Sequence, residues 1–206
     1  MGDRLFCNIR ADLARARVDN VGPGWWNTYL GIFLKPGTMA VLTYRFSRWA
    51  RGIRVPILRQ ALVVTAGVLR FAAEIVSGVS ISPKANIGPG LVVHTTYGVF
   101  VGATTIGKNC FVQHGVVIAY GIRRIGDNVY FGPGAKAIGN ATIGNNVIVA
   151  ANSVVVNDVP DDTTVMGVPA RISVARGRRL LFNYEAQLGD GVGAQPSAAV
   201  PGPQRD

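Results

Sequence analysis

A chain of 206 residues, 49% hydrophobic and only 16% charged, is long enough for one sizeable domain and too apolar for a disordered protein. Its 26 glycines and 11 prolines exclude a helical bundle. Two distant cysteines, Cys7 and Cys110, give neither a disulfide framework nor a zinc site, so we expect a reducing, cytoplasmic compartment and no metal. The formal net charge of +10 favours an anionic partner.

The first third of the chain predicts helices. Apolar residues recur with helical spacing over residues 38–52 and 56–77, and Pro56 suits the first turn of the second helix. Residues 4–17 predict another short helix. Residues 1–27 lack the apolar core of a signal peptide, and charges within 57–76 argue against a membrane span.

A basic stripe is predicted within the helical region, because arginines recur every three residues at Arg45, Arg48, Arg51 and Arg54. A solvated face or a contact with another subunit is the favoured interpretation. Attachment to an anionic membrane surface is the alternative.

A six-residue repeat fills the middle of the chain. Its apolar positions are Ile81, Ile87, Val93, Phe100, Ile106, Val112, Ile118, Ile125, Phe131, Ala137, Ile143, Val149 and Val155, and small or β-branched residues follow most of them four positions later. This pattern predicts a triangular parallel β-helix in which each coil buries its apolar face by stacking on its neighbours. We expect one wall to carry Val93, Val112, Phe131 and Val149 in successive coils, with Cys110 as a small core residue.

The repeat gains one residue at two places, and both lie near residues that can do chemistry. Only two histidines occur, His94 and His114, and the register places them on neighbouring coils. The extra residue between Val93 and Phe100 predicts a bulge that aims His94, which favours catalysis over a structural role. The second extra residue, in AYGIRR, brings Arg123 and Arg124, as the rim of a cleft or as a solvated turn.

A general base would need a partner that fixes its tautomer, yet no carboxylate occurs between Glu74 and Asp127. Backbone carbonyls, Asp19 from the helical region, or a neighbouring subunit are the candidates for orienting His94.

Several stretches resemble one known family. YFGPGAKAIGNATIGNNVIVAANSVVVNDVPDDTTVMGVPARI and VVHTTYGVFVG resemble the hexapeptide acyltransferases, and specifically the serine O-acetyltransferases. LFCNIRADLARARVDN and KPGTMAVLTYRFSRW look like the helical front end of that family. The resemblance covers most of residues 4 to 172.

The resemblance implies a left-handed β-helix, a homotrimer or a dimer of trimers, and acetyl transfer from acetyl-CoA to a hydroxyl in a groove between subunits. His94 would take the proton from the acceptor. The CoA arm would pass Ala119, Pro133, Gly134 and Ala151, with Lys136 and Arg171 near its phosphates.

The chain departs from the family pattern around the acceptor. GVSISPKANIG carries Ser80 and Ser82 where the family has an aspartate paired with the histidine, and Val93 replaces an acidic residue. A longer loop with a second histidine is shortened to AYGIRR, with Ile122 near the histidine's place. Arg123 and Arg124 are left as candidates for holding the acceptor, together with Asp19.

The family resemblance makes L-serine the first acceptor to consider. A sugar hydroxyl in a surface polysaccharide pathway is the rival acceptor. A catalytically weak β-helix that serves in binding or assembly is the alternative of another class. Nucleic acid is not expected, because no recognition motif appears.

The chain divides into a helical region (1–78), a β-helix (79–172) and a C-terminal extension (173–206), which we expect to be disordered from about residue 188 because its composition is rich in Gly, Pro and polar residues. The basic stretch ARGRRLLF could pack on the coil end or reach CoA phosphates.

Overall fold

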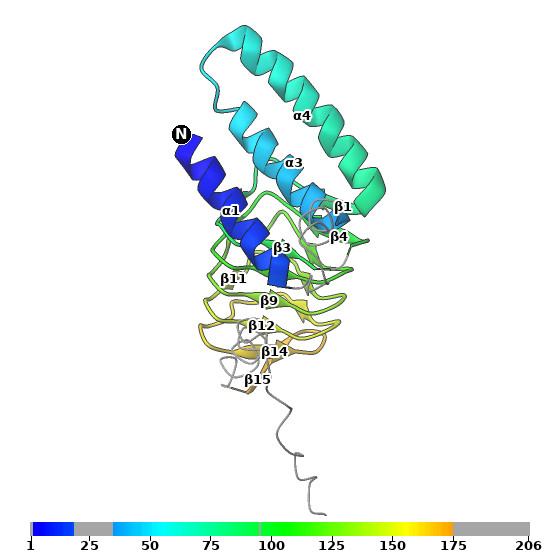
Figure 1. Cartoon of the computed structure of the whole chain (residues 1–206). Helices are drawn as coiled ribbons and strands as arrows, with labels where there is room; N and C mark the ends of the chain where they lie inside the picture. The colour runs from blue at the N-terminus through cyan, green and yellow to red at the C-terminus, as the bar shows by residue number, and fades with distance from the viewer. Residues whose placement is uncertain (1, 19–34, 95, 175–206) are drawn as a thin grey trace, which may run out of the picture.

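Three helices precede a stack of short strands in the computed structural model, which describes residues 2–18, 35–94 and 96–174 (Figure 1). The helices are α1 (Gly2–Val18), α3 (Pro36–Ala50) and α4 (Pro56–Ser77), so the three predicted helices are confirmed. Pro56 occupies the first turn of α4. Asp19, the ARGRRLLF stretch and the tail from residue 188 lie outside the described residues.

The strands build the three walls of a parallel β-helix. Sheet A contains β1 (Val79–Ile81), β4 (Val99–Val101), β7 (Val117–Ile118), β10 (Lys136–Ala137) and β13 (Val154–Val155). Sheet B contains β2 (Asn86–Ile87), β5 (Thr105–Ile106), β8 (Arg124–Ile125) and β11 (Thr142–Ile143). Sheet C contains β3 (Val92–Val93), β6 (Phe111–Val112), β9 (Tyr130–Phe131), β12 (Ile148–Val149), β14 (Thr164–Met166) and β15 (Arg171–Val174).

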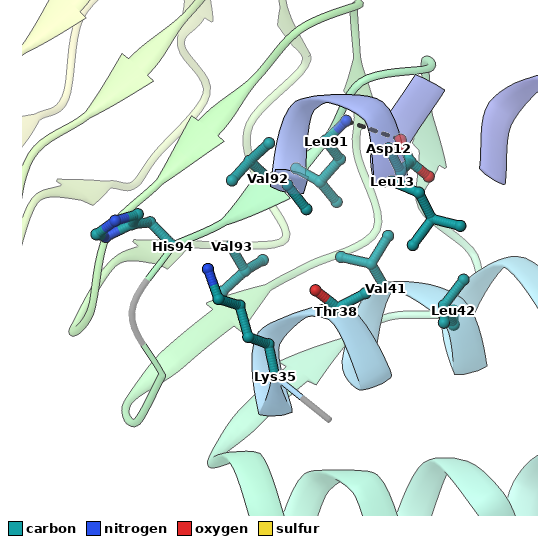
Figure 2. Close-up of a pocket in the computed structure, with 11 residues that line it drawn as sticks. Asp12, Leu13, Lys35, Thr38, Val41, Leu42, Leu91, Val92, Val93 and His94 are labelled. Carbon is teal, nitrogen blue, oxygen red and sulfur yellow. Dashed lines mark hydrogen bonds between the residues drawn. The ribbon is translucent and has the colours of Figure 1, made fainter. Parts of the chain in front are cut away.

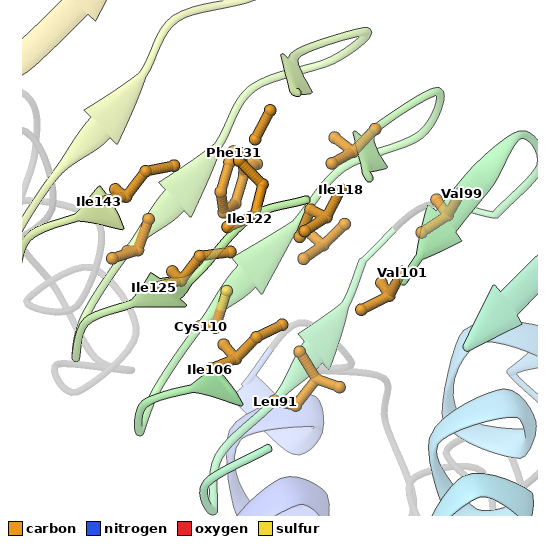
Figure 3. Packing of buried hydrophobic residues seen from close by; sticks show 14 of the residues in the cluster. Leu91, Val99, Val101, Ile106, Cys110, Ile118, Ile122, Ile125, Phe131 and Ile143 are labelled. Carbon is orange, nitrogen blue, oxygen red and sulfur yellow. The ribbon is translucent and has the colours of Figure 1, made fainter. Parts of the chain in front are cut away.

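The predicted wall is confirmed in its register. Val93 pairs with Val112, Val112 with Phe131, and Phe131 with Val149, so one coil follows the next on sheet C. The aliphatic side chains of successive coils stack along the inside of the helix, where Cys110 lies among them (Figure 3). Burial of these side chains is the main favourable contribution to folding, at about 25 cal/mol per Å² of apolar surface.

One repeat position was predicted wrongly. Val99 and Val101 are buried and Phe100 points outward, because alternate residues of a strand face opposite sides. Val101, not Phe100, pairs with the inward Ile118. The corner after Val93 therefore holds two extra residues rather than one, and Phe100 packs edge-on against Tyr120 at 5.4 Å between ring centroids.

A ladder of amide side chains runs along the corner between sheets B and C. Asn109, Asn128, Asn146 and Asp162 all have φ between 54° and 58°, a left-handed conformation that Asn and Asp tolerate better than other side-chain-bearing residues. Each amide donates to the oxygen of the next coil, at 3.1, 3.0 and 2.9 Å. The same residue type thus satisfies the turn geometry and joins the coils.

Helix α3 is fastened to the first coil by the arginines of the predicted stripe. Arg45 is buried against Asp12, Arg48 donates to Asn86 Oδ1 at 3.3 Å, and Arg51 donates to the Pro83 carbonyl at 3.0 Å. Three of the four arginines therefore bind this chain's own β-helix. Neither a fully solvated face nor a membrane contact describes these three arginines.

The two ends of the β-helix are covered differently. Helices α3 and α4 contact β1 at the first coil. At the other end β15 returns antiparallel to β14, whereas the other strand pairs in the described residues are parallel. Helix α4 is also long and apolar enough, by length and composition alone, to cross a membrane.

Candidate functional site

The corner between sheets C and A gathers five of the eleven predicted site residues. We call it the C–A corner: residues 94, 96–98, 113–116, 132–135 and 150–153, one segment in each of four successive coils. It contains His94, His114, Pro133, Gly134 and Ala151. Both histidines are exposed, so their imidazoles are open to a reactant.

His94 follows β3 directly and its backbone amide donates to the Val112 carbonyl at 3.0 Å. Its ring stacks on Phe111, with centroids 5.5 Å apart and planes 30° apart. Phe111 in turn stacks on Tyr130 at 5.4 Å and 18°. A column of three rings on neighbouring coils therefore fixes the plane of the imidazole. Sequence reasoning missed this positioning element because successive rings of the column are 17 and 19 residues apart along the chain.

The enlarged corner after His94 is shaped by strained backbone. Tyr97 has φ 77° and Gly98 has φ 72°, and the Tyr97 amide donates to the Ser77 carbonyl at the end of α4. The Tyr97 carbonyl accepts from Gly115 at 3.0 Å in the next coil. A side-chain-bearing residue held at positive φ costs energy and such strain clusters at functional sites. The extra residues thus present His94 and join the corner to α4.

A buried ion pair holds the segment that leads into His94. Asp12 accepts from the amides of Gly90 and Leu91 at 2.7 and 2.9 Å, and from Arg45 Nε at 2.9 Å. Arg45 also donates to the carbonyls of Ile87 and Gly88, each at 2.6 Å.

Burial raises the pKa of Asp12 above its ordinary value, because desolvation outweighs the lowering by Arg45 and by the two backbone amides. Sequence analysis did not predict this ion pair. The signal for it was one charged residue on the inward face of each helix, Asp12 in α1 and Arg45 in α3. Asp12 lines the same small cavity as His94, but its carboxylate serves as an anchor for the turn that precedes β3.

A cavity of about 20 Å³ separates the helices from β3 and has His94 at its rim (Figure 2). Asp12, Lys35 and Thr38 are among its polar lining residues. The volume suits a single water molecule and not a substrate. Figure 2 shows the imidazole directed away from α1 and α3, so the face open to a reactant is the outer one.

The lower coils continue the C–A corner as a strip of small residues. Gly134 N donates to the His114 carbonyl and Asn152 N to the Pro133 carbonyl, each at 2.8 Å, so these turns lie in line. Gly134 has φ 70°, and a Cβ there would collide with Asn152 Oδ1. Glycine is therefore required at this position by the packing of the turn against the next coil.

Two predicted cation positions lie close to this strip or at its end. Lys136 begins β10 on the adjoining wall and is exposed, with Nζ 3.2 Å from the Gly134 carbonyl. Arg171 begins β15 at the last coil and is also exposed.

Other predicted residues are not brought to this corner within one chain. Ala119 follows β7 at the next corner, between sheets A and B. Arg123 lies beside sheet B, where Nη2 is 2.6 and 2.7 Å from the two oxygens of Asp158, and Arg124 is exposed in β8. Ile122 is buried in the core, so the coil accommodates the extra residue between Ile118 and Ile125 by packing Ile122 inward.

The described residues contain no group of three His, Cys, Asp or Glu side chains placed to hold a metal ion. The C–A corner itself offers an exposed imidazole, a run of backbone donors and nearby cations.

Comparisons with known proteins agree with this geometry. The family described as bacterial transferase hexapeptide (six repeats) matches residues 124–157. A serine acetyltransferase of Synechococcus elongatus is 34% identical over 153 residues, 70% of this chain and 60% of that protein. The chain thus spans less than two thirds of this curated relative.

Two solved structures are similar over more of their length. Soybean serine acetyltransferase complexed with serine is 31% identical, with a TM-score of 0.67, covering 83% of this chain and 70% of that one. A serine acetyltransferase in complex with CoA is 27% identical, with a TM-score of 0.68 and the same coverage.

Proposed function

Because the chain belongs to the serine acetyltransferase family of hexapeptide-repeat proteins, we propose that it transfers an acetyl group from acetyl-CoA to a hydroxyl group, with L-serine as the first acceptor. The observation that carries the proposal is the exposed His94, presented by an enlarged corner above a strip of small residues. In solved relatives of this fold, serine is bound in one structure and CoA in another.

His94 is the proposed general base. Its neutral imidazole takes the proton of the acceptor hydroxyl as that oxygen attacks the thioester carbonyl. Collapse of the tetrahedral intermediate releases the CoA thiolate, which receives the proton from the imidazolium, so the histidine is regenerated. Such proton transfer contributes about 10²- to 10⁴-fold in rate. Backbone N–H groups of the corner are suited to stabilising the oxyanion.

Phe111 is the proposed positioning residue for this base. Stacking fixes the ring plane of His94 without a carboxylate, which suits a chain that has no acid between Glu74 and Asp127. Its hydrocarbon ring supplies no charge, so Phe111→Leu should lower kcat while leaving the pH dependence of kcat/KM unchanged.

The CoA arm is proposed to lie along the C–A corner, past Pro133, Gly134 and Ala151. Lys136 and Arg171 would pair with its phosphates, since cations bind phosphate through charge-assisted hydrogen bonds. The family resemblance adds Ala119. Because Ala119 lies one corner away, its contact would be made by a neighbouring subunit of a homotrimer or a dimer of trimers.

The acceptor contacts are proposed on the same basis. Asp19, Arg123 and Arg124 would reach the acceptor from the helical region or from a neighbouring subunit. His114, one coil below His94, is the reserve candidate for the base. A cytoplasmic enzyme making O-acetylserine would serve cysteine biosynthesis.

A second acceptor class is favoured by a specific observation. Ile122 is buried where the family has a carboxylate-binding histidine, and Arg123 is already paired with Asp158. An uncharged acceptor such as a sugar hydroxyl needs neither a carboxylate-binding histidine nor a free arginine. A binding or assembly role, with little turnover, is the alternative of another class.

A thiol-release assay with acetyl-CoA tests the proposal, run against L-serine, homoserine and a panel of sugars. Release with L-serine supports the first reading, and release only with a sugar moves the protein to carbohydrate acetylation. His94→Ala should lose at least about 100-fold in kcat/KM. Turnover of His94→Ala near the wild-type rate, with loss in His114→Ala, would transfer the base to His114. No release and no acetyl-CoA binding would contradict the proposal and favour the binding or assembly role.

A further inference from the structure

Helix α4 is apolar on the side that faces solvent. Its exposed large hydrophobic residues run the whole length of the helix: Ile57, Leu58, Val64, Val68, Leu69, Phe71, Ile75 and Val76. Ile57 is 84% exposed, Ile75 68% and Phe71 66%, so these side chains are left open by the residues that the structure describes. Figure 1 shows α4 at the outer edge of the helical cap.

The polar side chains of α4, apart from that of Thr65, lie outside this face. Ala66, Ala73 and Ser77 are buried on the side packed against α3. Arg70 and Glu74 form an ion pair at 3.8 Å, one turn apart. At 100° per residue the exposed apolar residues cover an arc of roughly 160°, with Thr65 the single polar residue inside it. In most amphipathic helices of globular proteins the apolar face points toward the core and the polar face toward solvent.

The width of the arc decides between two kinds of partner. A seam with one partner helix needs a narrower stripe, as in the a and d positions of a coiled coil. Ile57, Val64, Val68, Phe71 and Ile75 would fit such a seam, but Leu58, Leu69 and Val76 would stay outside it. A flat apolar surface can cover the whole arc.

The charges around α4 indicate that the apolar surface it contacts is anionic. Residues 20–73 contain no Asp or Glu, and their basic residues are Lys35, Arg45, Arg48, Arg51, Arg54, Arg59 and Arg70. Arg45 is neutralised by Asp12, whereas Arg54 and Arg59 are exposed at the start of α4. An apolar helix face beside uncompensated arginines is complementary to lipid tails beneath anionic headgroups.

We propose that α4 lies flat on an anionic membrane, with its exposed face in the lipid and the arginines at its N-terminal end among the headgroups. The 22-residue helix does not cross the bilayer, because α3 packs along it and would carry its own arginines into the hydrocarbon. The membrane contact that the sequence left as an alternative is thus assigned to α4, with Arg54 as the one arginine of the stripe that takes part. This inference does not depend on the acceptor of the proposed reaction.

Vesicle sedimentation of the full-length protein tests the proposal. Vesicles of phosphatidylglycerol and phosphatidylcholine should bind the wild type, vesicles of phosphatidylcholine alone should bind it less, and raising the salt should weaken the anionic binding. Val68→Glu places a charge in the centre of the arc and should reduce partitioning by about tenfold or more. Val156→Glu makes the same change at an exposed valine on the distant coils and should bind as the wild type does.

Two further measurements separate membrane binding from misfolding and from self-association. Arg54→Gln with Arg59→Gln should reduce binding to anionic vesicles while binding to neutral vesicles stays the same. Circular dichroism and light scattering of each variant establish folding and subunit number. Absence of wild-type binding to anionic vesicles overturns the proposal. If Val68→Glu instead changes the subunit number and vesicles bind neither protein, the face belongs to a second copy of the chain.

Discussion

Replacing Arg45 by Met should loosen the helices from the β-helix, because this side chain makes four buried hydrogen bonds. Two go to Asp12 and two to the carbonyls of Ile87 and Gly88. The substitution keeps much of the side-chain volume but leaves the Asp12 carboxylate buried without its cation. Removing one partner of a buried ion pair costs about 3–5 kcal/mol. For a chain of this size that corresponds to a fall in Tm of about 6–20 °C.

Arg48→Met is the matched control, since Arg48 is one turn away and makes a single exposed hydrogen bond of 3.3 Å to Asn86. Its loss should cost less than about 1 kcal/mol. Thermal unfolding followed by tryptophan fluorescence compares the two, with Trp49 in α3 as a probe of the cap. Asp12→Asn combined with Arg45→Met should recover part of the stability, because a neutral amide oxygen still accepts from the Gly90 and Leu91 amides. Equal Tm values for Arg45→Met and Arg48→Met would refute the reasoning.

The remaining predictions concern the coils. Asn128→Ala should cost about 2–3 kcal/mol by urea unfolding, since it breaks two rungs and leaves a Cβ at positive φ; Asn128→Gly should cost about 1 kcal/mol less. Thr104→Val should raise Tm and Thr104→Ser should not, because the Thr104 hydroxyl is buried with no hydrogen-bond partner in the described structure. Native protein should show one reactive thiol with Ellman's reagent, the exposed Cys7, and a second only after denaturation, because burial raises the pKa of Cys110 to about 12. The Thr142 amide and the Arg123 guanidinium hold the pKa of Asp158 below its ordinary 3.8. The contribution of the ionised carboxylate to folding stability is therefore complete above pH 3.8 and is lost as the pH falls through the lower pKa of the folded state. Urea midpoints of wild type and Asp158→Asn should therefore converge in acid; a constant difference at all pH values would show that the carboxylate charge is not involved.

The repeat made the β-helix predictable because each coil needs one large and one small inward side chain, so register follows from spacing alone. The error at Phe100 shows the limit of that rule. At the enlarged corner both Phe100 and Val101 satisfy an apolar pattern, and only the pairing with Ile118 decides which one faces inward.

The candidate site was partly predictable for a similar reason. His94 was identified because it interrupts the repeat, and Pro133, Gly134 and Ala151 because they resemble family positions. Asp12 and Phe111 could not be identified in this way, since their roles depend on how separate helices and coils meet. The orientation of α4 was also beyond reach, because an apolar face in a sequence does not say whether it meets the core or something outside the chain.

The antiparallel return of β15 has a consequence for how these molecules coexist in a crowded solution. A parallel β-helix is a template for its own extension, since each finished coil exposes the hydrogen-bonding edge that the next coil needs. Strand β15 occupies the last edge of sheet C in the reverse direction, so a second molecule cannot continue the parallel pairing there. With helices over the first coil, the β-helix is protected at both ends against end-to-end growth into fibres.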